Sequence, residues 1–160
     1  MSARVLVVDD LVPNVKLLSA KLQAEYFDVV TALSGMEALQ KVAESPPDLI
    51  LLDVMMPGMD GFEVCQRLKS DPKTTHIPIV MVTALSDTEN RVRGLEAGAD
   101  DFLTKPVNDI ALFARARSLI RLKLTSDQWR LREKTSVQFG MMDEDRPITS
   151  EPAGSARILL

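Results

Sequence analysis

The chain has 160 residues, of which 46% are hydrophobic and 26% charged, a composition that fits one globular domain with a tail. The formal net charge of −4 argues against nucleic-acid binding through a basic surface. The single cysteine, Cys65, excludes an internal disulfide, no apolar run reaches the roughly 20 residues of a membrane span, and the first residues contain no export signal. We therefore expect a cytoplasmic protein that binds neither nucleic acid nor membrane.

Short apolar runs alternate with amphipathic segments along most of the chain. The runs lack the in-out alternation of a half-solvated strand, so they predict parallel strands buried on both faces. These predicted strands are 4–8, 28–32, 48–52, 77–82 and 100–103. The predicted helices are 13–25, 34–44, 60–70, 88–97 and 107–134. Five βα units in succession predict an α/β, flavodoxin-like, doubly wound sheet of five parallel strands in the order 2-1-3-4-5, followed by an extended C-terminal helix.

The last predicted helix is longer than a compact domain needs. Its apolar residues recur at helical spacing and alternate with arginine and lysine; the apolar positions are Ile110, Phe113, Ile120, Leu124 and Leu131. A solvated basic face on a C-terminal helix and a connector to another domain or chain both fit this pattern. We place a first domain at 1–124 and a C-terminal helix extension at 125–139.

Beyond the last helix the pattern changes. Residues 140–154 are acidic and aperiodic and contain Gly, Pro and Ser, which predicts a linker. Residues 155–160, SARILL, match residues 2–7, SARVLV, in type at every position. Because an unpaired strand would expose apolar surface and backbone polar groups, we expect 155–160 to begin a second domain similar to the first.

Chemically capable side chains follow four of the predicted strands. Asp9 and Asp10 end the first strand, Asp53 ends the third, Thr83 ends the fourth, and Lys105 follows the fifth. The carboxyl ends of parallel strands share one edge of a sheet, so we expect these side chains to converge. Three neighbouring carboxylates repel one another, and a hard divalent cation such as Mg²⁺ relieves that repulsion. Aspartates that merely cap turns or helices are the simpler interpretation. That interpretation does not explain why aspartates, a threonine and a lysine occur together at the ends of four strands.

Other kinds of site lack essential parts. No glycine-rich nucleotide loop of the form G-x-x-x-x-G-K occurs. The only histidine, His76, lies in a predicted surface loop and does not suit a Ser-His-Asp set. We expect Cys65 and most of the eight methionines to serve packing.

Four motifs, VLVVDD, LILLDVMMPGMDG, IPIVMVTA and GADDFLTKP, occur in this order. Over about residues 3–124 the chain resembles the receiver domains of two-component response regulators. The resemblance implies a regulatory domain rather than an enzyme. A sensor histidine kinase or a phosphotransfer protein would transfer a phosphoryl group to Asp53 in a reaction that depends on Mg²⁺, or on Mn²⁺ in its place.

The same resemblance implies a role for each site residue. Asp10 would bind the metal directly, Asp9 through water, and Asp53 as both ligand and nucleophile, with the backbone carbonyl of Met55 as a further ligand. Thr83 and Lys105 would bind phosphoryl oxygens.

The resemblance also covers the switch and the lifetime of the phosphorylated state. The Lys105–Pro106 peptide bond would be cis. Thr83 would move toward the phosphoryl group, and Phe102, at the switch-aromatic position, would turn into the space it leaves. The side chains two residues after Asp53 and Thr83, which are Met55 and Leu85, would flank the attacking water in hydrolysis. Because neither can orient a water molecule, we expect slow dephosphorylation.

A closer resemblance is to the first receiver of PleD-type response regulators. It implies a parent protein with a second receiver-like domain and a diguanylate cyclase domain, and a homodimer formed on phosphorylation. The 160 residues contain no GGEEF motif, so cyclase activity would belong to the parent. Two alternatives stay open: a dimerisation or adaptor domain that is never phosphorylated, and a haloacid-type phosphatase, which is disfavoured because Asp53-Val54-Met55 is no D-x-D motif.

Overall fold

The structure is a computed structural model that describes residues 2–84 and 87–124. All of these except Leu124 belong to one compact unit. Five parallel strands form a single sheet in the order β2-β1-β3-β4-β5, which confirms the predicted doubly wound topology. The strands are β1 (Arg4–Val8), β2 (Asp28–Ala32), β3 (Leu49–Leu52), β4 (Ile79–Thr83) and β5 (Asp101–Thr104).

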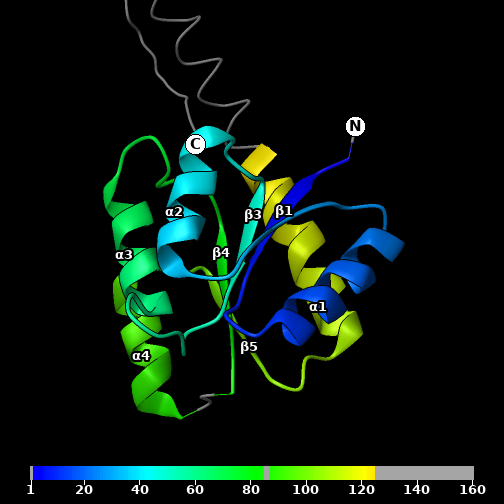
Figure 1. The fold of residues 1–160 in the computed structure, drawn as a ribbon. Helices are drawn as coiled ribbons and strands as arrows, with labels where there is room; N and C mark the ends of the chain where they lie inside the picture. The colour runs from blue at the N-terminus through cyan, green and yellow to red at the C-terminus, as the bar shows by residue number, and fades with distance from the viewer. Residues whose placement is uncertain (1, 85–86, 125–160) are drawn as a thin grey trace, which may run out of the picture. The chain divides into compact units, whose positions relative to one another are not determined.

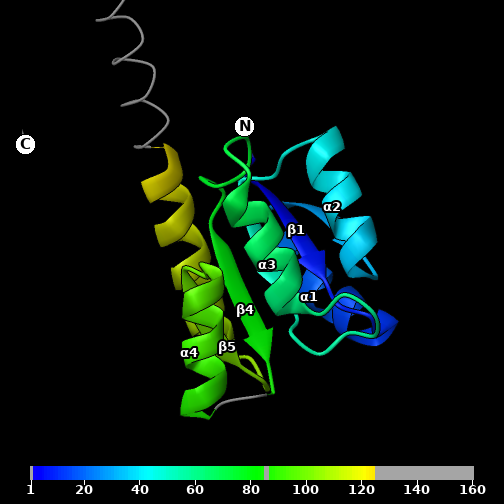
Figure 2. The same ribbon diagram turned by 90° about the vertical axis from the view of Figure 1, so that its left-hand side faces the viewer.

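Helices cover both faces of this sheet. They are α1 (Val12–Ala24), α2 (Gly35–Glu44), α3 (Gly61–Ser70), α4 (Thr88–Ala97) and a last helix described over 109–124. Figure 1 shows α2, α3 and α4 on one face, and α1 with the last helix on the other. Figure 2 shows α3 and α4 side by side in front of β4. None of the helices in the described ranges is long and apolar enough to cross a membrane.

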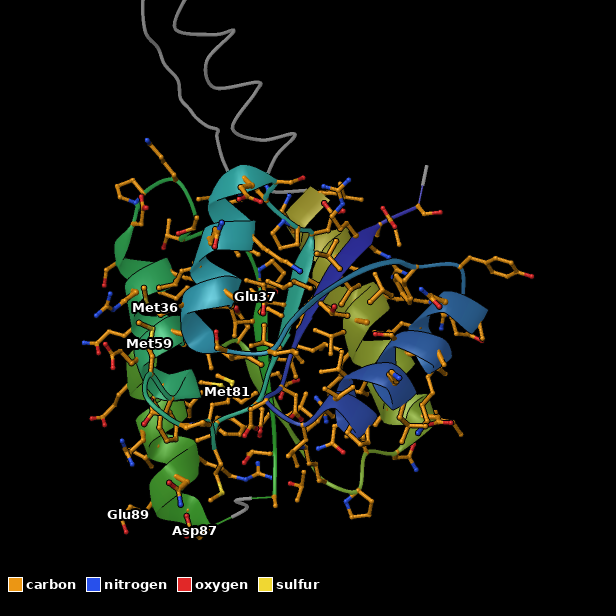
Figure 3. All side chains as sticks on the ribbon, viewed as in Figure 1. Met36, Glu37, Met59, Met81, Asp87 and Glu89 are labelled. Carbon is orange, nitrogen blue, oxygen red and sulfur yellow. The ribbon has the colours of Figure 1, made fainter. Side chains whose placement is uncertain are left out.

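Alternating side chains of the strands feed two separate cores. In β1, Leu6 and Val8 join the core under α2, α3 and α4, whereas Val5 and Val7 join the core under α1 and the last helix. The other central strands divide in the same way, because successive side chains of a strand point to opposite faces. Met81 of β4, for example, points into the α2–α3 layer in Figure 3.

Three predicted strands begin too early, and the structure gives the reason for each. β4 begins at Ile79 instead of Ile77, since Pro78 has no N–H with which to extend the ladder. β3 begins after Asp48, whose carboxylate accepts the N–H of Arg4 at 2.8 Å. β5 begins after Asp100, whose carboxylate accepts the N–H of Ile79 at 2.8 Å. Both aspartate side chains thus bond the first residue of a neighbouring strand.

The last helix buries only part of the predicted stripe, since Ile120 is buried and Phe113 packs against the core. Its buried residues are Leu112, Ala116 and Ile120, one helical turn apart, whereas Ile110 and Leu124 are exposed. Arginines on this helix pair with acidic residues elsewhere in the domain: Arg115 with Asp101 and Arg117 with Glu25. Over 109–123 this helix is therefore part of the receiver-like unit. Leu131 and the predicted segments 125–139, 140–154 and 155–160 lie outside the described residues.

Capping side chains set where three helices begin, next to the carboxyl ends of the strands. Ser34, Asp60 and Asp87 each accept the N–H three residues ahead and so cap α2, α3 and α4. Glu37, however, bonds the N–H of Leu33 at 2.8 Å instead of that of Ser34. The side-chain pair that caps α2 therefore closes at the residue before Ser34.

Candidate functional site

Three carboxylates meet at the carboxyl ends of β1 and β3. One oxygen each of Asp9, Asp10 and Asp53 lie within 4.8 Å of one another. The two strands are neighbours in the sheet, and the N–H of Asp53 bonds the carbonyl of Val8 at 2.9 Å. Asp9 and Asp53 are buried, and Asp10 is half-buried at the rim. The cluster is therefore accessible from solvent at Asp10.

The Asp9 carboxylate, only 2% exposed, is held by three donors. Its Oδ1 accepts the N–H of Leu11 at 2.9 Å, and its Oδ2 accepts from Asn14 Nδ2 at 3.2 Å and Lys105 Nζ at 2.9 Å. Sequence reasoning missed Asn14. A helix that begins just after the strand returns its first-turn side chains toward the strand end, and this spacing is the signal that could have found it.

The ammonium group of Lys105 lies between the carboxylates of Asp9 and Asp53. It is the only ammonium group among the described site residues. Lys105 donates its backbone N–H to the carbonyl of Thr83 at 2.9 Å, and its peptide bond to Pro106 is cis. Its Nζ lies 2.9 Å from Asp9 Oδ2 and 3.6 Å from Asp53 Oδ1. One positive charge thus faces three negative ones, and the balance of charge attracts a cation.

The electrostatics of Asp53 follow from this arrangement. Burial raises the pKa of the Asp53 carboxyl from 3.8 to about 6. That value already includes the charges of Asp9 and Asp10, which also raise the pKa, and the opposing effects of Lys105 and the backbone N–H of Met55, which lower it. A divalent cation beside Asp53 would offset the repulsion and keep the carboxylate ionised near neutral pH.

The donor set suits a hard divalent cation. All three side chains offer carboxylate oxygens, and Asp10 is open enough to solvent for bound water to complete the coordination of Mg²⁺ or Mn²⁺. The Met55 side chain is 60% exposed, so it does not fill the site. Figure 3 shows Asp87 and Glu89 at the start of α4, at the same end of the molecule, where they add negative potential.

Thr83 and Phe102 lie on one face of the sheet. The strand register pairs Met81 with Phe102 and Thr83 with Thr104. Because side chains two residues apart in a strand share a face, Thr83 and Phe102 both point to the face that α4 covers. Thr83 is buried at the end of β4. The Phe102 ring is 8% exposed and packs against Gly94 of α4. The ring is thus already inside in this structure, and its turn upon phosphorylation stays a prediction.

A close backbone contact fixes the loop that carries Asp53. Gly61 begins α3 directly on this loop: a β-carbon there would overlap the Asp53 carbonyl oxygen and lie 2.8 Å from Val54 Cα. Gly58 has φ +77°, which other residues rarely adopt. The turn between β3 and α3 thus needs both glycines to place Asp53.

Other singled-out residues lie away from the cluster. His76 is half-buried in the turn that precedes β4, at the other end of the sheet. Cys65 is buried in α3, its Sγ lies 3.5 Å from the Ala97 carbonyl, and burial raises its thiol pKa to about 12. Cys65 therefore packs, as expected. Leu85 lies outside the described residues.

Comparison with known proteins places this site in a family. The sequence model of the response regulator receiver domain matches residues 5–117. This chain belongs to the receiver domains of two-component response regulators. The match covers the five strands, apart from Arg4 of β1, and the strand ends where the carboxylates, Thr83 and Lys105 lie.

Curated relatives of this receiver domain are longer proteins. Response regulator PleD of Caulobacter vibrioides is 58% identical over 142 residues, which are 89% of this chain and 31% of PleD. The phosphate regulon regulatory protein PhoB of Rhizobium meliloti is 43% identical over 121 residues, 76% of this chain and 53% of PhoB. The chain thus spans about a third of PleD and about half of PhoB. The expected similarity to PleD is confirmed.

Solved structures of receivers have the same fold. Chemotaxis protein CheY4 of Vibrio cholerae superposes with a TM-score of 0.71 at 34% identity, over 74% of this chain and 99% of its own. A CheY-like receiver from Methanospirillum hungatei gives a TM-score of 0.74 at 28% identity, over 79% of this chain and 99% of its own. Both are short chains that the receiver unit matches almost completely.

Proposed function

We propose that this receiver domain accepts a phosphoryl group on Asp53 while Mg²⁺ is bound beside it. The observation that supports this most strongly is the position of Lys105 Nζ, 2.9 Å from Asp9 and 3.6 Å from Asp53. An ammonium group at this distance can pair with a phosphoryl oxygen on Asp53. A half-exposed acidic rim beside it offers the cation a place.

Asp10 and Asp53 would bind Mg²⁺ directly, Asp9 through water, and Met55 through its backbone carbonyl. The cation would supply positive charge against the phosphoryl oxygens and would keep Asp53 ionised. An Asp53 oxygen then attacks the phosphorus of a phosphohistidine or a small acyl phosphate. The new O–P bond forms as the bond to the donor breaks, and the donor atom keeps the electron pair.

The remaining site residues stabilise the product. Lys105 would turn toward a phosphoryl oxygen, and the hydroxyl of Thr83, at the end of the neighbouring strand, would donate to another. Because Thr83 and Phe102 point to the same face of the sheet, which α4 covers, movement of Thr83 would change the packing of Phe102 against α4. Phosphorylation would in this way alter the surface formed by α4, β5 and the last helix.

The phosphoryl donor would be a sensor histidine kinase or a phosphotransfer protein. Its docking is supported by apolar side chains that are exposed on and just before α1, beside the site: Leu11, Val12 and Leu17. A partner that covers them brings its phosphohistidine next to Asp53.

The whole protein would extend beyond these residues. We place the receiver at 1–124, a helix extension at 125–139, a linker at 140–154 and the start of a second receiver at 155–160. The similarity to PleD supports this layout, because it covers 89% of the chain and therefore passes the end of the receiver match at residue 117. The parent would be a cytoplasmic response regulator whose output is a diguanylate cyclase, activated as a homodimer.

Intact-mass measurement after incubation with acetyl phosphate and Mg²⁺ tests the acceptor. Wild type should gain one phosphoryl group and Asp53→Asn none, since the amide has no nucleophilic carboxylate oxygen. Asp60→Asn is the matched control, because asparagine still caps α3 and Asp60 lies in the same loop. A phosphoryl group on Asp53→Asn would move the acceptor elsewhere. Unmodified wild type would favour a phosphorylation-independent adaptor.

Thermal unfolding with and without Mg²⁺ tests the cation. A ligand that binds only the native state raises its stability by mass action, so millimolar Mg²⁺ should raise the melting temperature of wild type. Asp10→Asn should lose most of this gain, because it removes the half-exposed ligand. An unchanged wild-type melting temperature, together with phosphorylation that does not need Mg²⁺, would contradict the proposed metal site.

A further inference from the structure

Asn14 and Lys105 share one oxygen of the buried Asp9 carboxylate. Asn14 Nδ2 lies 3.2 Å and Lys105 Nζ 2.9 Å from Asp9 Oδ2, and the other oxygen is occupied by the N–H of Leu11. Asp9 Oδ2 is therefore the point where α1 and the segment after β5 meet.

Asn14 does not serve its own helix. Asparagine near a helix start often caps free N–H groups, yet α1 has no side-chain cap and the Asn14 amide reaches back to Asp9. The side chain is half-buried and also lines a cavity of about 260 Å³ beside Lys105 and Pro106. Its position thus matches a role in the carboxylate cluster and not in helix formation.

In the proposed reaction, Lys105 pairs with one group before phosphorylation and with another after it. In this structure it pairs with Asp9, whereas the proposed reaction needs it on the phosphoryl group of Asp53. When Lys105 leaves, a carboxylate that is almost fully buried loses its charged donor, and a buried acceptor without a partner is costly. Leu11 bonds only Oδ1, so Asn14 is the side-chain donor that stays on Oδ2.

We propose that Asn14 is a positioning residue that keeps Asp9 hydrogen-bonded and oriented while Lys105 turns to the phosphoryl group. The inference rests on the proposed function, because only a phosphoryl group on Asp53 gives Lys105 a reason to move. Without Asn14, Asp9 holds Lys105 more tightly and is less well oriented toward a bound cation.

Asn14→Leu removes the amide and keeps the branched shape. Its Mn²⁺ binding, followed by the electron paramagnetic resonance of free Mn²⁺, should weaken about fivefold. Its initial rate of phosphorylation by acetyl phosphate should fall about tenfold even at saturating Mg²⁺, because Lys105 is retained by Asp9. Asn14→Gln keeps the amide, and the adjoining cavity has room for one more methylene, so this variant should recover part of both losses.

Gln40→Ala is the matched control. Gln40 Nε2 donates to Glu44 at 3.1 Å on the exposed face of α2, so the variant loses an amide–carboxylate bond away from the site. It should bind Mn²⁺ and take up phosphoryl like wild type. A melting curve for each variant without metal shows that the domain is folded.

A double-mutant cycle with Lys105→Met decides between a positioning role and a merely structural one. If Asn14 acts by freeing Lys105, Asn14→Leu should slow phosphorylation in wild type but not in Lys105→Met. Additive losses, or an Asn14→Leu variant with wild-type rate and Mn²⁺ affinity, would overturn the inference alone. A wild type that takes up no phosphoryl group would instead overturn the proposed function.

Discussion

The phenyl ring of Phe102 occupies the space that a β-carbon on Gly94 would need. Such an atom would overlap Cζ and Cε2 of the ring and lie 3.3 Å from Cε1. The guanidinium of Arg91 lies 5.9 Å from the centre of the same ring. β5 and α4 are thus coupled through one aromatic side chain that sits two residues along the sheet from Thr83.

Gly94→Ala should therefore disturb this contact. Alanine favours a helix by about 1 kcal/mol over glycine, but the overlap with Phe102 forces the ring or α4 to shift, at roughly 1–3 kcal/mol. We expect a lower free energy of unfolding in urea. Phe102→Ala removes the obstacle, so in that background Gly94→Ala should be neutral or stabilising. Equal destabilisation in both backgrounds would show that the ring is not the obstacle.

The stability of the metal-free domain should depend on the charge of Asp53. Its pKa, raised to about 6 by burial, lies above the unfolded value, so its contribution to stability is present below about pH 4 and is lost as pH rises through 6. The amide that replaces it in Asp53→Asn does not titrate. Relative to wild type, the free energy of unfolding of this variant should therefore rise by roughly 1–3 kcal/mol between pH 4 and pH 7. Urea unfolding at a series of pH values measures the difference.

Glu37 supplies a control of opposite sign for this pH experiment. The N–H of Leu33 holds the pKa of Glu37 below its usual value, so its contribution is present above that value and is lost as pH falls. Relative to wild type, the free energy of unfolding of Glu37→Gln should therefore fall as the pH rises. If Asp53→Asn and Glu37→Gln drift in the same direction, burial does not control the titration of Asp53.

Hydrolysis of the phosphorylated state should be slow because Met55 cannot orient water. Its side chain is largely exposed, so Met55→Asn does not disturb the core. Together with Leu85→Glu, at a position outside the described residues, it should speed phosphate loss about tenfold if better placement of water is worth roughly 1.4 kcal/mol. Phosphate release after removal of the donor gives the rate. Met36→Asn, an equally exposed methionine, should decay like wild type.

Phosphorylation should also promote self-association. Apolar side chains are exposed on α4 and the last helix, including Leu95 and Ile110, the latter 80% exposed. Sedimentation with beryllofluoride and Mg²⁺ should show a shift toward dimer, and Ile110→Glu should reduce it. A wild type that stays monomeric at high concentration would count against dimerisation through these residues in this part of the protein.

Much of the fold was predictable because burial leaves a local trace. Short apolar runs such as LILL, in which Ile50 and Leu51 face opposite cores, are typical of strands covered on both faces, and five of them separated by helices favour one simple topology. The same logic put aspartates, a threonine and a lysine at strand ends, and strand ends of a parallel sheet share an edge.

Strand starts and the stripe of the last helix were not predictable in this way. Asp48 and Asp100 look like strand residues, but each turns its carboxylate to the backbone of a neighbouring strand. Ile110 and Leu112 are equally apolar, and only the rotation of the helix against α1 and the sheet decides which is buried.

The amino-acid sequence by itself determined the doubly wound sheet and the set of residues at its carboxyl edge. Hydrophobic periodicity and strand ends depend only on residues that are close together in the sequence. Only the tertiary structure decided which of those residues bond one another. Asp9 and Lys105 are 96 positions apart, Asn14 comes from a different element, and the three meet on one oxygen. Such a meeting depends on strand register and helix packing, where a shift of one residue turns a side chain to the opposite face.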